Sequence, residues 1–202
     1  MKESRVAVPG ITCVVLIDRF LHGDEPPLSR KKLNELIKKF GKYDEIFIAA
    51  PLKKVSFYES YTSDDETISI IPIENGSDER KLLRQILREI SDFQYAIFHP
   101  INDPLVSPFI LKIFEEMIDD HFIVIMRVKN RLDPWRAIYD IENVLYLLEN
   151  THTNKKLNDF LETTKKTLVI DDFALKSFER SKILYEKIEK AKDISKLKRR
   201  FI

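Results

Sequence analysis

Up to about residue 130, the hydrophobic positions of the chain alternate between two patterns. Short apolar runs rich in β-branched residues predict strands, and the first of them is so continuously apolar that it predicts burial on both faces. Between the runs, apolar residues recur three and four positions apart, which predicts amphipathic helices. The predicted strands are 11–17, 46–50, 68–73, 94–98 and 122–128, and the predicted helices are 29–40, 79–90 and 107–119. This alternation predicts a three-layer α/β domain with a mostly parallel sheet.

Two stretches depart from the alternation. Residues 52–66 are polar and predict a surface excursion without an element of its own. After Lys129 a loop over 131–139 leads into a short extended piece. Helices over 141–149 and 155–164, a short strand over 168–170 and a long charged helix over 177–192 follow. We therefore expect one domain over residues 1–202, with a core over about 8–130, a C-terminal subdomain over about 131–195 and a basic tail over 196–202.

Composition and charge exclude several classes of protein. Hydrophobic residues make up 44% and charged residues 33%, which is typical of a folded globular chain. The net charge of +1 gives no bulk attraction to nucleic acid or to a membrane. No apolar run approaches the ~20 residues of a membrane span, and no signal-peptide pattern opens the sequence. We expect a cytoplasmic protein with neither of those partners.

The single cysteine and the basic C-terminal run each have two interpretations. Cys13 lies inside an apolar run, far in sequence from any histidine, so a buried core thiol is favoured over a nucleophile. A single cysteine also forms no internal disulfide, which fits a reducing compartment. The basic run from Lys196 to Arg200 is either a frayed tail or a contact for RNA or another acidic partner, and the tail is favoured.

The strongest candidate site follows the strand 94–98. The chain passes His99 and Pro100 and turns through Asn102, Asp103 and Pro104. Open α/β sheets place ligands just beyond the carboxyl ends of central strands, so Asp103 is the candidate ligand of a divalent cation. The alternative is a turn residue that accepts hydrogen bonds from its own backbone.

Other residues near the ends of the strands have a structural and a functional interpretation. Asp18 and Arg19 end the first strand and are either an altered site or a surface ion pair. His99 is either a ligand contact or a histidine hydrogen-bonded at a strand end. Trp135 and Tyr139 either stack on a ligand ring or pack in the core. The structural interpretation is favoured for Asp18, Arg19 and His99. For the aromatic pair, packing in the core or the subdomain has at least as much support as stacking.

Two segments resemble one family. Residues 97–108 (Ile-Phe-His-Pro-Ile-Asn-Asp-Pro-Leu-Val-Ser-Pro) and 133–139 (Asp-Pro-Trp-Arg-Ala-Ile-Tyr), with the order of elements, resemble the molybdenum-cofactor guanylyltransferases (MobA-like). The resemblance implies a Rossmann-like nucleotidyltransferase domain that transfers a nucleotidyl group from GTP to molybdopterin or a similar phosphorylated acceptor. It implies Mg²⁺ on Asp103. Our candidate nucleotide contacts are Asp18, Arg19, Gly23, Arg30 and Lys31, although none of the three basic residues lies in a recognisable family motif.

The first loop departs from the family pattern. The family has a pair of glycines there, whose backbone N–H groups approach the triphosphate, whereas this chain reads Leu-Ile-Asp-Arg-Phe over 16–20 and has four glycines in all. One unscreened like charge from Asp18 near a phosphate costs about 1–4 kcal/mol. We therefore expect weak nucleotide binding and slow or absent transfer. Whether the chain is an enzyme stays open. The chain is either an inactive binding or regulatory partner, or its site has been rebuilt around Arg19, Arg30 and Lys31 for another ligand.

Overall fold

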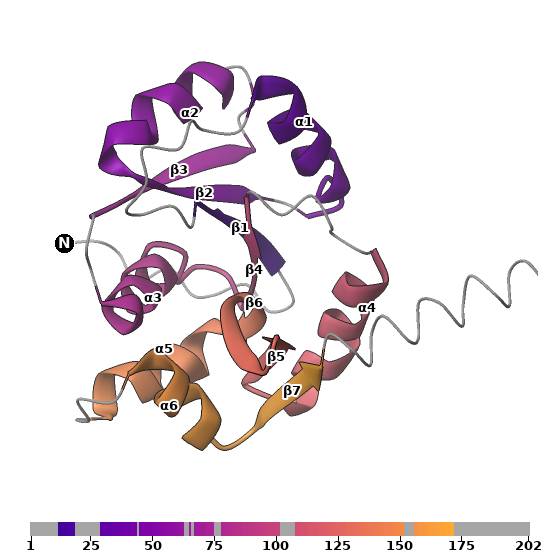
Figure 1. Cartoon of the computed structure of the whole chain (residues 1–202), viewed down its shortest axis with the longest axis vertical. Coiled ribbons are helices and arrows are strands. Elements are labelled where there is room, and N and C mark those ends of the chain that lie inside the picture. Colours follow the sequence, from indigo (N-terminus) through magenta and orange to yellow (C-terminus); the bar gives the residue numbers. More distant parts are fainter. Residues whose placement is uncertain are drawn as a thin grey trace, which may run out of the picture.

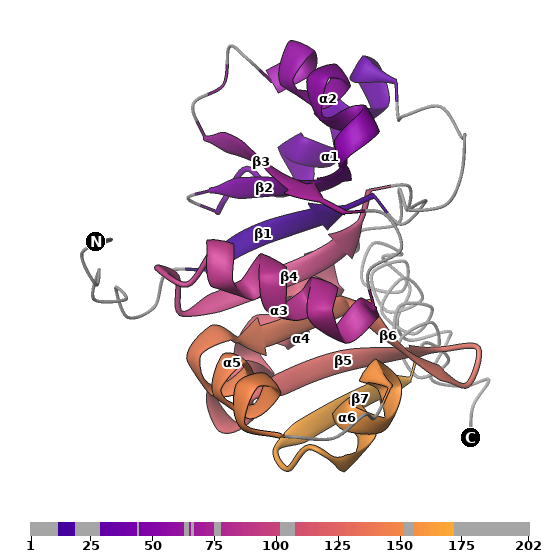
Figure 2. The same ribbon diagram turned by 90° about the vertical axis from the view of Figure 1, so that its left-hand side faces the viewer.

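The computed structural model describes residues 12–18, 29–43, 45–62, 65, 67–74, 78–101, 108–151 and 156–171. These residues build one seven-stranded sheet in the order β3-β2-β1-β4-β6-β5-β7 (Figures 1 and 2). The strands are β1 (Thr12–Ile17), β2 (Ile46–Pro51), β3 (Ile68–Ile73), β4 (Tyr95–Pro100), β5 (Ile123–Val128), β6 (Arg131–Asp140) and β7 (Thr167–Asp171). β6 is antiparallel to β4 and β5, and the other paired strands in the described sheet are parallel. The predicted α/β class with a mostly parallel sheet is confirmed.

Helices cover both faces of the sheet, as the buried strands require. One face carries α1 (Arg30–Lys39), α2 (Val55–Thr62) and α4 (Pro108–Met117). The other carries α3 (Glu79–Glu89), α5 (Ile141–Asn150) and α6 (Leu157–Thr163), which lie in front of the sheet in Figure 2. Two short 3₁₀ helices, η1 (Leu52–Lys54) and η2 (Ile118–Asp120), follow β2 and α4. No helix in the described ranges is long and apolar enough to cross a membrane.

β1 lies between β2 and β4 and has solvent on neither face. Cys13, Val14, Val15 and Leu16 are all completely buried. Cys13 and Val15 pack toward α3, whereas Val14 and Leu16 pack toward α1. Burial raises the pKa of the Cys13 thiol far above its ordinary value, so the thiol stays protonated and inert. The interpretation of Cys13 as a core residue is confirmed.

Local sequence sets where the helices begin. Asp78 caps α3, because its carboxylate accepts hydrogen bonds from the backbone N–H groups of Arg80 and Lys81. Asp140 caps α5 in the same way through the N–H of Asn143. Ser29 occupies the N-cap position of α1, but its hydroxyl forms no capping hydrogen bond. Ser29 therefore marks the start of α1 by its position alone.

Two predicted segments are corrected. Residues 52–66 contain η1 and α2 rather than a surface excursion without structure. The segment 131–139 is the long strand β6, not a loop with a short extended piece. The segment contains Pro134, and proline is disfavoured in a central strand because it donates no hydrogen bond to a neighbouring strand. The sheet accommodates this proline in a bulge. Ile125 of β5 pairs with Ala137 and the next residue, Met126, pairs with Asp133, so residues 134–136 of β6 bulge out of the pairing.

The remaining boundaries agree with the predicted elements to within a few residues. The predicted helix over 177–192 and the basic tail over 196–202 lie outside the described residues. The division of the chain into a core and a C-terminal subdomain stays a prediction. β6 and β7 belong to the same sheet as β1.

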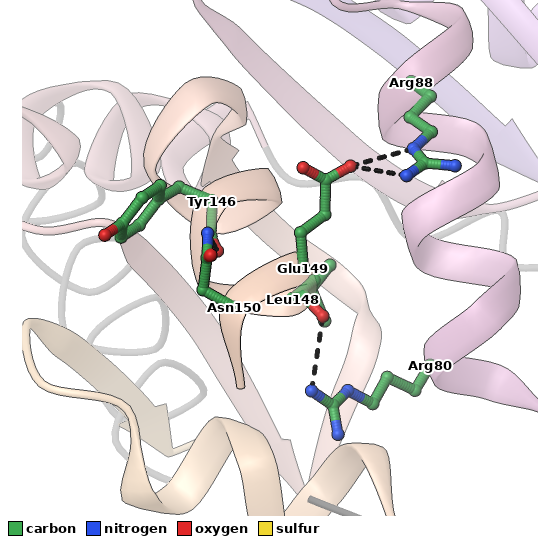
Figure 3. Close-up of polar contacts among 6 residues, drawn as sticks. All are labelled: Arg80, Arg88, Tyr146, Leu148, Glu149 and Asn150. Atoms are coloured by element: carbon green, nitrogen blue, oxygen red, sulfur yellow. Dashed lines mark hydrogen bonds and ion pairs between the residues drawn. The ribbon is translucent and has the colours of Figure 1, made fainter. Parts of the chain in front are cut away.

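On the face away from α1, the helices α3 and α5 are joined by polar contacts (Figure 3). Arg88 on α3 donates two hydrogen bonds to one carboxylate oxygen of Glu149 on α5, at 2.6 and 3.0 Å. Arg80 donates to the carbonyl oxygen of Thr151 at 2.7 Å and lies over the ring of Phe160. Arg80 thus neutralises the carboxyl end of α5 while covering α6.

Candidate functional site

The sheet has a topological switch point between β1 and β4. From β1 the chain crosses through α1 to β2 on one side, and from β3 it returns through α3 to β4 on the other. The two strands run parallel from Thr12 opposite Tyr95 to Ile17 opposite Pro100, and the N–H of Ile101 then donates to the carbonyl of Ile17 at 2.8 Å. In open α/β sheets this is where a crevice for ligands forms.

Asp18 is the first residue beyond β1 at this edge. Its backbone N–H donates to the carbonyl of Ala49 on β2 at 3.0 Å, which holds it in the sheet. The residue is 1% exposed. Its carboxylate oxygen Oδ2 accepts hydrogen bonds from Lys54 Nζ at 3.0 Å and from Tyr58 Oη at 2.9 Å. A buried carboxylate is thus paired with a buried ammonium at the carboxyl end of β1.

Lys54 and Tyr58 reach Asp18 from the segment that follows β2. Pro51 ends β2, η1 turns the chain, and α2 continues from Val55. Because Lys54 and Tyr58 are four residues apart on consecutive helical turns, both side chains lie on the same side, toward β1. Tyr58 is completely buried and Lys54 is 6% exposed. We name Asp18, Lys54 and Tyr58 the Asp–Lys–Tyr cluster.

This geometry corrects two expectations about Asp18. The surface ion pair that the sequence favoured is wrong for this residue, because Asp18 is buried and is bound by Lys54. The repulsion expected between Asp18 and a phosphate is also overestimated. Lys54 compensates the negative charge at 3.0 Å, so the edge does not present an uncompensated carboxylate.

Of the other predicted nucleotide contacts, Arg30 and Lys31 belong to the described part of the chain. The guanidinium of Arg30 lies 5.8 Å from the centre of the Tyr61 ring on α2. Lys31 is exposed on the first turn of α1. Arg19, Gly23 and Asp103 lie outside the described residues. Among the described residues, Lys54 forms an ion pair with Asp18, and the sequence did not single it out.

His99 and the aromatic pair take structural positions. His99, on β4, is buried, and its ring packs 5.6 Å from that of Phe40 on α1. Tyr139 is completely buried and donates its hydroxyl to the carbonyl of Pro134 at 2.6 Å. Trp135 and Tyr139 both pack against Phe98. The interpretation of these two aromatic residues as core packing therefore holds, and stacking of Tyr139 on a ligand is excluded.

A second ion pair stands at the same edge, beyond the paired part of β4. Pairing between β4 and β6 ends with Phe98 opposite Ala137, so the bulge before Ala137 lies beside the carboxyl end of β4. There Asp133 accepts hydrogen bonds from the guanidinium of Arg136 and, at 3.2 Å, from the backbone N–H of Trp135. Asp133 is buried, and these contacts fix its carboxylate in the bulge.

The described residues do not assemble a metal centre of their own. Among them, no group of three or more His, Cys, Asp or Glu side chains could hold a cation. Asp18 fits a Mg²⁺ ligand poorly, because Oδ2 already accepts from an ammonium and a phenol. A cation at Asp18 would have to compete with Lys54.

A cavity of about 340 Å³ lies apart from this edge, between α1 and α2. It reaches Ile68, the first residue of β3, at the amino edge of the sheet. Its lining consists of Asn34, Ile37, Lys38, Tyr61, Asp65 and Ile68. The cavity therefore contains none of the predicted site residues.

Comparisons with solved structures decide the fold type. Molybdopterin-guanine dinucleotide biosynthesis protein A from Archaeoglobus fulgidus superimposes with a TM-score of 0.58 at 16% identity, over 85% of this chain and 88% of that one. The 4-diphosphocytidyl-2C-methyl-D-erythritol synthase of Anaerococcus prevotii gives 0.58 at 11% identity, over 80% and 86%. This chain has the nucleotidyltransferase fold. The resemblance to MobA-like proteins noted in the sequence is thus confirmed for the fold.

A third similar structure contains a metal. Rv0371c from Mycobacterium tuberculosis in complex with manganese has a TM-score of 0.56 at 14% identity, over 80% of this chain and 88% of that one. At such identities the similarity establishes the fold alone. No family model matches the sequence, and no curated protein matches it.

Proposed function

We propose that the chain binds a nucleoside triphosphate at the carboxyl edge between β1 and β4 and transfers its nucleotidyl group to a phosphorylated acceptor. The observation that supports this most is the Asp–Lys–Tyr cluster, which puts a buried ammonium beside the carboxyl end of β1, one of the two strands that flank the switch point. GTP as donor and molybdopterin or a similar acceptor follow from the resemblance to MobA-like proteins.

The chemistry requires no nucleophile from the protein. An oxygen of the acceptor phosphate attacks the α-phosphorus of the nucleotide in line, the bond to the β-phosphate oxygen breaks, and pyrophosphate leaves. The protein must position the two reactants and compensate the charge that develops on the leaving group. Arg19, Gly23, Arg30 and Lys31 are the proposed nucleotide contacts. Mg²⁺ held by Asp103 would supply further charge compensation when bound.

The second candidate is a binding or regulatory partner without transferase activity. It is favoured by the pairing of Lys54 with Asp18, which engages the buried cation within the protein. The scarcity of glycine at the first loop points the same way, because residues 17–20 all carry side chains where the family has its glycine pair.

Calorimetry and an activity assay together separate the two candidates. The purified protein is titrated with GTP and CTP, with and without Mg²⁺, and pyrophosphate release is measured in the presence of molybdopterin. Pyrophosphate release that depends on Mg²⁺ and is lost in Asp103→Asn supports the transferase. Nucleotide binding without release supports the partner, and tight Mg²⁺–nucleotide binding that survives Asp103→Asn excludes Asp103 as the metal ligand.

A further inference from the structure

The Asp–Lys–Tyr cluster has the form of an occupied anion site. Two hydrogen-bond donors, an ammonium and a phenol, converge on one oxygen, Asp18 Oδ2, at 3.0 and 2.9 Å. A phosphate oxygen accepts hydrogen bonds from the same kinds of donor at the same distances. The donors belong to η1 and α2, whereas the carboxylate belongs to the end of β1. The acceptor is therefore carried by a different element from its donors.

The core around the cluster gives no structural reason for charge. Lys54 and Asp18 are 6% and 1% exposed. Tyr58 belongs to the hydrophobic core on the α1 side of the sheet, together with apolar side chains such as Leu16, Ile48 and Ile101. Replacing a buried ion pair by apolar side chains is often neutral or stabilising, because burial removes both charges from water. A buried pair in this place therefore favours a role for the charges in binding.

We propose that Asp18 holds the position of a phosphate group when no ligand is bound, and that a ligand carrying a pyrophosphate group binds by displacing the Asp18 carboxylate from Lys54 and Tyr58. This rests on the proposed function only for placing a nucleotide at this edge. The proposal adds that Lys54 is the cation that binds the phosphate and that Asp18 competes with the ligand for it. No covalent bond is made or broken, since a phosphate oxygen replaces the carboxylate oxygen of Asp18 as the acceptor of the same two hydrogen bonds.

Internal competition predicts a specific order of affinities. In the wild type the donors can bind a ligand only in the fraction of molecules in which Asp18 has turned away, so the apparent affinity equals the intrinsic affinity multiplied by that fraction. Asp18→Asn keeps the size of the side chain and removes its charge, so it should bind pyrophosphate at least tenfold more tightly. Lys54→Met should abolish binding whether or not Asp18 is present.

Inorganic pyrophosphate is the probe, and calorimetry with thermal melting is the readout. The proteins are the wild type, Asp18→Asn, Lys54→Met and the double variant, with Lys165→Met as the control for loss of one positive charge. Lys165 is exposed and precedes β7 at the amino edge of the sheet, so this variant should respond as the wild type does. A ligand that binds only the folded state raises Tm, and the rise should be largest for Asp18→Asn.

Several outcomes would overturn the proposal. Equal affinity in the wild type and Asp18→Asn would exclude the internal competitor, and an equal response of Asp18→Asn and the double variant would exclude Lys54 as the cation. If Asp18→Asn is unfolded without ligand, its refolding by pyrophosphate, absent in Lys54→Met, supports the proposal, and failure to refold contradicts it. Tight binding of pyrophosphate by Asp18→Asn without nucleotidyl transfer by the wild type would defeat the proposed function alone.

Discussion

Two ion pairs in this molecule have similar chemistry and different surroundings. Arg88 and Glu149 join α3 to α5 at 2.6 Å, with side chains 58% and 42% exposed (Figure 3). Lys54 and Asp18 join η1 to β1 at 3.0 Å, with side chains 7% and 1% exposed. Water solvates the first pair whether or not it is formed, whereas it solvates the second only after unfolding.

The difference determines what each pair can contribute. An exposed pair stabilises a fold by about 0–1 kcal/mol and is screened by salt. A buried pair has a large desolvation cost, so its net contribution to stability is small although the loss of one partner is severe. The exposed pair is adequately explained as a helix contact, but the buried pair is better explained by a ligand that needs the charge.

Removing one member of the buried pair should have the largest effect. Lys54→Met leaves the Asp18 carboxylate buried without its cation, and we expect a loss of about 3–5 kcal/mol in the free energy of unfolding. Urea denaturation measures it. The double variant Asp18→Asn/Lys54→Met should recover most of the loss, because it buries no charge. A double variant no more stable than Lys54→Met would contradict the compensation between the two charges.

The phenol of the cluster should come next. Tyr58→Phe removes the hydrogen bond of 2.9 Å to Asp18 and keeps the ring, which is completely buried. A hydrogen bond to a charged group contributes about 1.5–3 kcal/mol, so stability should fall by that amount in the same denaturation experiment. The effect should shrink in the Asp18→Asn background. An undiminished effect would show that the hydroxyl acts through another contact.

High pH should destabilise the core through Tyr139. Burial, with a smaller contribution from Glu79, raises the pKa of Tyr139 well above its ordinary value of 10.0. Below pH 10 the phenol is neutral in both states and its contribution is complete. Above pH 10 only the unfolded state loses the proton, so stability falls by about 1.4 kcal/mol per pH unit for this group.

Tyr139→Phe tests this assignment. It loses the hydrogen bond to Pro134, which costs about 0.5–1.5 kcal/mol at neutral pH, and should then decline less steeply above pH 10. Denaturation at pH 8 to 11 supplies both values. Tyr146→Phe is the matched control, because its side chain is 65% exposed on α5. An unchanged alkaline slope in Tyr139→Phe would rule out the contribution of Tyr139.

The exposed pair should give the smallest effect. Arg88→Ala and Glu149→Ala should each cost about 0–1 kcal/mol, and their coupling in a double-mutant cycle should vanish at 1 M salt, where the Debye length is about 3 Å. The coupling of Asp18 and Lys54 should persist at that salt concentration. A salt-insensitive coupling in the exposed pair would remove the distinction between the two.

The sequence predicted the sheet well because its strands are dictated by local pattern. The apolar run containing Cys13 and Val14 permits only a strand without solvent on either face, and β1 is that strand. α2 was missed because Val55, Ser56, Phe57 and Tyr58 are weak helix formers, and its position depends on packing against β2 and β3. β6 was missed because the bulge that tolerates Pro134 is formed by pairing with β5.

The candidate site was only half predictable. Asp18 follows a buried strand and could be found from its position in the pattern. Lys54 follows Lys53 in a polar stretch, where two adjacent lysines suggest a solvated surface. Its burial results from a contact between residues 36 positions apart in sequence, which no local pattern encodes. The one available signal was the spacing of Lys54 and Tyr58 directly after β2, which places both on one side of a helix.

A crystal structure with GTP and Mg²⁺ tests the central claim most directly. Crystals of the wild type and of Asp18→Asn are soaked under the same conditions. We predict an ordered triphosphate at the carboxyl edge between β1 and β4, with a phosphate oxygen within hydrogen-bond distance of Lys54 Nζ and Tyr58 Oη and the side chain at position 18 turned away. A triphosphate bound elsewhere, such as in the cavity between α1 and α2, or one that leaves the contact between Asp18 and Lys54 intact, would contradict the account.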